Sequence, residues 1–141
     1  MLTQNRLRQK GFTLVEIMIV VAIIALLAAI AVPSFLRARK RSQATSTLET
    51  ARLIDGAKDQ YAIENGKDAS CYPNWSDLTP YVKTGTALYI QMANNQIGTD
   101  ALGYEYRMNL VDTPVQVNTL TESLLSDVLP NPQSFWGSYY W

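Results

Sequence analysis

The sequence predicts an α+β fold, in which one long N-terminal α-helix packs by its second half on a small antiparallel β-sheet. Three observations point to this fold: an uninterrupted apolar run near the N-terminus, a helical apolar stripe after it, and an alternating apolar and polar segment near the C-terminus. With 141 residues, the chain has room for one modest domain besides the helix. We expect a basic leader over 1–11, the helix over 12–65, with a transmembrane part at about 12–36, and a head over 66–141.

The first half of the helix is predicted to span a membrane. Ile17–Leu36 is a run of 20 uncharged residues, and at about 1.5 Å per residue it matches a hydrocarbon core about 30 Å thick. The run could be a secretory signal cut after Ala31, a plain anchor or a more specialised leader. Glu16 favours the specialised leader. A carboxylate in the hydrocarbon costs about 2.5–3.5 kcal/mol, and neither a secretory signal nor a plain anchor requires one. Pro33 predicts a helix kink, since proline cannot donate a backbone hydrogen bond.

The second half of the helix is predicted from its periodicity. Apolar residues recur at spacings of three and four from Ala44 to Tyr61, and Asn65-Gly66 is a typical helix end. Asp55 and Asp59 belong to a polar stripe, which we expect to face solvent.

The head is predicted to combine short strands with short helices. The residues concerned are Trp75–Leu78 (a turn or helix), 87–92 (a strand), 104–110 (a half-buried strand), Pro114–Val117 (an edge strand) and Thr119–Glu122 (a capping box before a helix that ends at Pro130).

The composition excludes several kinds of site. Lys plus Arg and Asp plus Glu are 12 each, histidine is absent and Cys71 is the lone cysteine. A Cys/His zinc site, an internal disulfide and a Ser-His-Asp triad therefore cannot form within one chain. A neutral chain has no general attraction for nucleic acid. We expect a protein that is not an enzyme, with no catalytic residues.

The segment Gln9–Glu16 resembles the processing signature of type IV prepilins and of type II secretion pseudopilins. That signature is a basic leader ending in Gly, then Phe, then Glu four residues later, followed by an apolar helix with a proline, here Pro33. The resemblance implies that a prepilin peptidase cuts after Gly11 on the cytoplasmic side and N-methylates Phe12. It also implies that Glu16 pairs with the new amine of a neighbouring subunit and so checks register during polymerisation.

The resemblance implies a structural subunit of a pilus-like filament, and its first interpretation is a type II secretion pseudopilin that helps to move proteins out of the periplasm. Its partners would be copies of itself, other pilin-like subunits, an inner-membrane assembly platform with its ATPase, and membrane lipid before assembly. A pseudopilin would have no nucleic-acid partner. The subunit would cross the inner membrane once, with its head in the periplasm or outside. Major type IV pilins usually carry a C-terminal disulfide loop, so Cys71 alone favours a pseudopilin or a minor pilin.

Two alternatives remain open. One is a minor pilin of a type IV pilus or DNA-uptake machine. The other is a membrane-anchored or secreted binding module, whose contact surface would be the aromatic tail Phe135–Trp141. Packing within the head is the competing interpretation of that tail.

Asp100 and Asp112 are candidate calcium ligands, although we expect no cofactor. Thr99–Tyr104 resembles a turn of major pseudopilins, and some relatives bind calcium in the head. A calcium site needs 6–8 oxygen ligands, and turns rich in Asp and Asn are common without metal.

Overall fold

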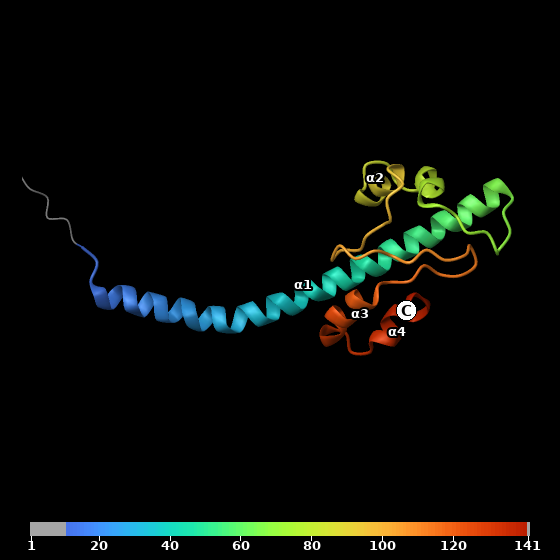
Figure 1. The fold of residues 1–141 in the computed structure, drawn as a ribbon. Helices are drawn as coiled ribbons and strands as arrows, with labels where there is room; N and C mark the ends of the chain where they lie inside the picture. Colours follow the sequence, from blue (N-terminus) through green and yellow to red (C-terminus); the bar gives the residue numbers. More distant parts are fainter. Residues whose placement is uncertain (1–10, 141) are drawn as a thin grey trace, which may run out of the picture. The chain divides into compact units, whose positions relative to one another are not determined.

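The computed structural model describes residues 11–140 and divides between Leu36 and Arg37 into two compact units. Its longest element is helix α1 (Leu14–Asn65), the blue-to-green helix of Figure 1. This is the long N-terminal helix that the sequence predicts, begun two residues later than expected. It is long and apolar enough to cross a membrane, and its most apolar 18-residue stretch has no buried residue.

Helix α1 ends where the sequence predicts. Gly66 has a φ of +58°, a left-handed conformation that glycine adopts without steric cost. The amide of Lys67 then donates to the carbonyl of Ala62 at 2.9 Å. This hydrogen bond is the one that closes a Schellman motif and satisfies an orphan carbonyl of the last turn.

The part of α1 that follows the apolar run forms one wall of the hydrophobic core. Its buried positions are mostly small, which lets the rest of the chain approach the helix backbone closely. They are Ala44, Thr47, Leu48, Ala51, Ile54, Ala57, Lys58 and Ala62. The residues packed against them come from the head and include Leu78, Leu88, Met92, Tyr106, Met108, Val115, Val117, Leu125, Val128, Leu129 and Trp136.

The head is built from short helices joined by extended chain. They are the 3-10 helix η1 (Trp75–Tyr81), α2 (Ala87–Ala93), α3 (Thr119–Leu125), η2 (Ser126–Val128), α4 (Pro132–Trp136) and η3 (Gly137–Tyr139). Figure 1 shows α2 at one end of this unit and α3 and α4 at the other, with the extended residues between them. The turn or helix predicted at 75–78 is the beginning of the 3-10 helix η1.

The predicted antiparallel sheet is not confirmed. Between residues 11 and 140 there are two isolated antiparallel bridges, Thr99–Glu105 and Arg107–Gln116, and no strand. In the predicted edge strand, Gln116 forms the bridge, because its amide donates to the carbonyl of Arg107 at 3.0 Å and its carbonyl accepts from the amide of Arg107 at 2.9 Å. The amide of Val115 donates to a side-chain oxygen of α1, and that of Val117 donates to the carbonyl of Tyr139. These two amides face away from Arg107, and the next bonded pair of the ladder would join Asn109 to Pro114, which has no amide hydrogen to donate.

The alternation over 104–110 nevertheless identifies two buried residues correctly. Tyr106 and Met108 are buried, while Glu105 and Arg107 are exposed. The Tyr106 hydroxyl donates to the carbonyl of Thr47 at 2.8 Å. The buried face of this extended segment thus packs against α1.

The strand predicted over 87–92 is wrong, because these residues form α2. The hydroxyl of Thr86 accepts from the amide of Tyr89 at 3.2 Å and caps the helix. Leu88 and Met92, four residues apart, are both buried, which is the spacing of one helix face. The β-branched and aromatic residues among them favour a strand locally, but packing on the core favours the helix.

The short helix after residue 119 is confirmed, but its cap lies one residue earlier than predicted. The side chain of Asn118 accepts from the amide of Leu120 at 3.0 Å and caps α3. The second half of the predicted helix is η2, which ends at Val128, and Pro132 begins α4.

Candidate functional site: the N-terminal end of helix α1

The predicted cleavage point lies just outside the helix. Gly11, Phe12 and Thr13 are exposed and non-helical, and α1 begins at Leu14. The Phe12 side chain is 85% exposed, and among the described residues no atom other than those of its chain neighbour lies within 4 Å of a Cβ built on Gly11. A peptidase could therefore reach the Gly11–Phe12 bond without unwinding a helical turn. Residues 1–10 of the predicted leader lie outside the described residues.

Thr13 and Glu16 form a capping box at the start of α1. The Glu16 carboxylate accepts from both the backbone amide and the hydroxyl of Thr13, each at 2.8 Å. In return, the Thr13 hydroxyl accepts from the amide of Glu16 at 3.2 Å. This reciprocal pair satisfies two backbone amides that a helix N-terminus would leave without partners. A carboxylate is also favoured there by the helix dipole.

Thr13 is not among the site residues predicted from the sequence. The signal was present, because Thr13-Leu14-Val15-Glu16 is the Thr-x-x-Glu spacing of a capping box in front of an apolar run. The structure therefore gives Glu16 a partner within its own chain, besides the neighbouring amine that the family resemblance implies.

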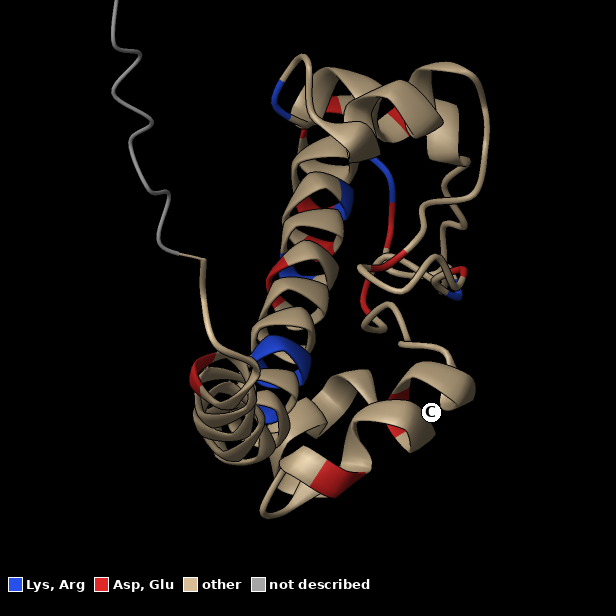
Figure 2. Ribbon diagram, turned by 90° about the vertical axis from the view of Figure 1, so that its left-hand side faces the viewer, with Lys and Arg blue, Asp and Glu red and all other residues tan. Residues whose placement is uncertain are grey.

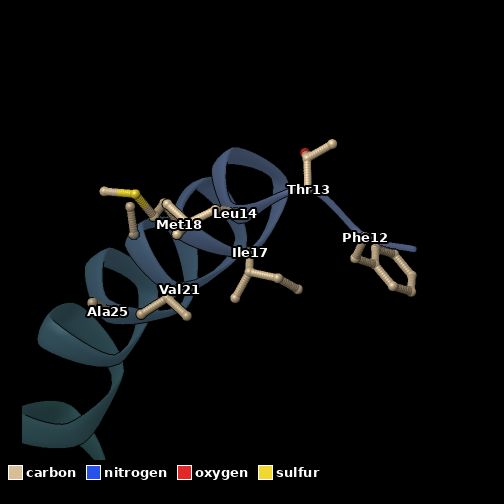
Figure 3. A pocket seen from close by; sticks show the side chains of 8 residues that line it. Phe12, Thr13, Leu14, Ile17, Met18, Val21 and Ala25 are labelled. Atoms are coloured by element: carbon tan, nitrogen blue, oxygen red, sulfur yellow. The ribbon is translucent and has the colours of Figure 1, made fainter.

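The turns that follow the capping box carry an apolar surface. A shallow hollow of about 670 Å³ lies on this surface, lined by Phe12, Thr13, Leu14, Ile17, Met18, Val21, Ala22 and Ala25. Figure 3 shows the side chains that line it. Every residue of Leu14–Leu36 is exposed in the isolated chain. A surface this apolar needs lipid or other apolar helices around it.

Helix α1 continues through Pro33 without a break. The next residue, Ser34, donates from its hydroxyl to the carbonyl of Ala31 at 2.9 Å. A serine that bonds the preceding turn can satisfy a carbonyl near the hydrogen bond that proline removes. The predicted kink at Pro33 stays a prediction.

The calcium candidate Asp100 has a structural role in the head. One carboxylate oxygen accepts from the amides of Leu102 and Tyr104 at 2.8 and 3.0 Å, and the other accepts from the hydroxyl of Thr121. Asp100 thus holds its own turn closed and ties it to α3. Asp112 accepts from the hydroxyl next to it on Thr113. Within residues 11–140, no three Cys, Asp or Glu side chains gather closely enough to hold a metal ion.

The aromatic tail is partly a core element. Trp136 is 1% exposed, and its ring meets that of Phe135 edge-on with centroids 4.9 Å apart. Tyr139 is half-buried, Tyr140 is 38% exposed, and Trp141 lies outside the described residues. Packing within the head thus accounts for the buried members of the tail. Cys71 is a half-buried free thiol.

Comparison with known proteins matches the N-terminal region. Residues 6–32 match the family described as the prokaryotic N-terminal methylation motif. The chain is 52% identical over 63 residues to the type IV wide pilus major component PilA4 of Thermus thermophilus. This match covers 43% of this chain and 47% of the relative. It is 40% identical over 68 residues to a type IV major fimbrial protein FimA of Dichelobacter nodosus. This match covers 48% of this chain and 42% of the relative.

The chain thus spans less than half the length of these curated relatives. No solved structure matches it.

Proposed function

This chain is type IV pilin-like over its N-terminal region, and we propose that it is a structural, non-enzymatic subunit of a type IV pilus-like filament. The observation that carries the proposal is the fully exposed apolar surface of Leu14–Leu36, interrupted near its start by one carboxylate, that of Glu16. Before assembly this surface would lie in the inner membrane, and afterwards it would pack against the same surface of other subunits. Helix association without water depends on such close apolar packing and on few polar contacts.

We propose that prepilin peptidase cleaves after Gly11 and N-methylates Phe12. The exposed, non-helical backbone at this point supports the step, since it leaves the bond accessible. Cleavage would create a cationic amine on Phe12, next in the chain to Thr13. In the free subunit the capping box satisfies Glu16, and in the filament the amine of a neighbouring subunit would pair with it. A buried carboxylate loses much of its energetic penalty beside a cation.

The proposed filament is a pilus, and a type II secretion pseudopilus is the second candidate. The printed names of the relatives are those of a major pilus component and of major fimbrial proteins, which supports a pilus. Cys71 as the lone cysteine supports a pseudopilus or a minor subunit. In each case we propose assembly with copies of the chain and other pilin-like subunits by an inner-membrane platform and its ATPase.

The first experiment is the intact mass and N-terminal sequence of the protein extracted from membranes of its native host. The proposal predicts a start at Phe12 carrying one extra methyl group. A start at Val32 would instead indicate an ordinary secreted protein. An uncut Met1 would indicate a simple membrane anchor.

The second experiment compares Glu16→Ala with Glu49→Ala, which removes an equally exposed carboxylate later on α1. Both variants should still be cut at Phe12. Electron microscopy of sheared cell-surface material should show filaments for wild type and Glu49→Ala, and none for Glu16→Ala. Filaments of normal length from Glu16→Ala would overturn the assembly role.

Normal surface filaments are expected for a pilus, whereas secreted proteins trapped in the periplasm of a deletion strain would indicate the pseudopilus.

A further inference from the structure

A pocket lies at the end of the head where α1 leaves the apolar run. Its volume is about 340 Å³, and it is lined by Arg41 and Thr45 of α1 and by Val128, Leu129, Pro130 and Phe135 of the C-terminal segment. One side of the pocket is therefore cationic and hydroxyl-bearing, and the other is apolar. This combination suits a ligand that has an anionic group next to hydrocarbon.

The surroundings of the pocket are strongly basic. Arg37, Arg39, Lys40 and Arg41 follow one another within five residues of α1. Figure 2 colours the Lys and Arg positions of the chain blue. The acidic group that faces them is Asp127, whose two carboxylate oxygens accept from Lys40 at 2.9 and 2.8 Å. Four cations against one carboxylate leave a local charge of +3.

Arg41 is positioned at the pocket by a hydrogen bond. Its Nε donates to the carbonyl of Val128 at 3.2 Å. Among the described residues, no acceptor is assigned to its two terminal nitrogens. A guanidinium held by one nitrogen can still present two parallel donors, the arrangement that binds phosphate oxygens.

The position of these residues in the chain places them at the depth of lipid head groups. Arg41 is five residues beyond Leu36, or about 7 Å further along a helix. A bilayer is about 40–45 Å thick in total and its hydrocarbon core is about 30 Å thick, so the polar layer on each side is about 5–7 Å thick. Arg41 therefore lies within this layer if the hydrocarbon ends at Leu36.

We propose that this pocket binds the phosphate group of one anionic phospholipid molecule, with Arg41 as the specific contact. The phosphate would lie against the guanidinium of Arg41, while Val128, Leu129 and Phe135 contact the glycerol and the first methylenes. The bound lipid would hold the head at the membrane surface before assembly. The proposal requires that Leu14–Leu36 lies in a bilayer, but not that the chain polymerises.

The test is native mass spectrometry of the full-length chain in detergent micelles, titrated with phosphatidylglycerol, phosphatidylcholine or inorganic phosphate. We expect one phosphatidylglycerol to bind at least about tenfold more tightly than phosphatidylcholine, which corresponds to about 1.4 kcal/mol. Inorganic phosphate should not compete at equal concentration, because it lacks the apolar part. Equal affinity for the two lipids would overturn the proposal, and so would full competition by phosphate.

Arg41→Gln and Arg39→Gln form a matched pair, because each removes one positive charge from the same basic cluster and only Arg41 lines the pocket. Phosphatidylglycerol affinity should fall at least about tenfold in Arg41→Gln and no more than about fivefold in Arg39→Gln, since diffuse attraction is worth about 1 kcal/mol or less per charge. Equal losses would show attraction without a site. Arg41→Lys keeps the charge but loses the paired donors, so its affinity should lie between those of wild type and Arg41→Gln. Circular dichroism melting of each variant separates lipid loss from unfolding of the head.

Discussion

The ammonium group of Lys58 lies 3.0 Å from a carboxylate oxygen of Asp55, one turn earlier on α1, and the Lys58 side chain has no exposed surface. The same ammonium donates to the carbonyl of Thr113 at 2.6 Å. The same carboxylate oxygen accepts from the amide of Val115 at 2.9 Å. This buried ion pair therefore binds the extended segment 113–115 to α1.

We predict that Asp55→Ala destabilises the head by about 3 kcal/mol, because it leaves the charge of Lys58 buried without a counter-ion. The value belongs at the lower end of the range for buried pairs, since the Asp55 side chain is 19% exposed. Asp59→Ala is the control, because Asp59 is exposed on the next turn, and it should change stability by no more than about 0.5 kcal/mol. Urea unfolding of the full chain in micelles, followed by tryptophan fluorescence, measures both. Equal effects would contradict a structural role for the pair.

A second prediction concerns Gly98, which packs closely against Trp75. A Cβ at Gly98 would lie 2.8 Å from the indole ring and 3.0 Å from a methyl group of Leu88. Gly98→Ala should therefore destabilise the head by about 1–3 kcal/mol through overpacking. Gly56→Ala is the matched control, because nothing lies within 4 Å of its Cβ, and removing a helix-interior glycine should stabilise by about 0.5–1 kcal/mol. Melting temperatures that move in the same direction would refute this account.

The third prediction is an acid-dependent loss of stability at Asp127. The hydrogen bond from Lys40 lowers the pKa of the Asp127 carboxyl below its usual value. A folded-state pKa below the unfolded one contributes stability that is present above the unfolded pKa of about 3.9 and is lost as pH falls through the folded value. The melting temperature of Asp127→Asn should thus be lower than that of wild type at pH 7 and converge with it in strong acid. A gap that stays constant down to the lowest pH would exclude the ion pair as its cause.

The fourth prediction concerns the capping box. Thr13→Val keeps the shape of the side chain but removes the hydroxyl that accepts from the amide of Glu16. We expect hydrogen exchange at the Glu16 amide to rise about fivefold in micelles, since losing an N-cap costs about 1 kcal/mol. Thr13→Ser retains the hydroxyl and should exchange like wild type. Protection unchanged in Thr13→Val would show that the box does not hold the first turn.

The sequence predicted α1 well because its signals are local. An uncharged run, a repeat of three and four residues and an Asn-Gly stop each act over a few neighbouring positions. The signal of Glu16 was also local, because the free-energy cost of a carboxylate in a membrane follows from the residue type and its place beside the apolar run. The signal for Thr13 was equally local. It lay in the three-residue spacing between Thr13 and Glu16, which is that of a capping box.

The head was harder to predict because its elements are short and depend on what they pack against. Leu88 and Met92 fit a helix face, yet Tyr89 and Ile90 between them favour a strand, and seven residues are too few for propensity to decide. Asp55 was placed on the solvated stripe with Asp59, and both positions are equally polar in sequence. Only the folded segment 113–115, which covers one carboxylate and not the other, distinguishes them.

The sequence by itself therefore determined the membrane-compatible helix, its end, and the candidate processing site at Gly11 and Phe12. The tertiary structure alone decided that Lys58 is buried, that Asp100 holds a turn, and that Arg41 lines a pocket with Val128. The physical reason is distance along the chain. Helix formation and apolar length are set by neighbouring residues, whereas burial of a charge depends on groups dozens of residues away.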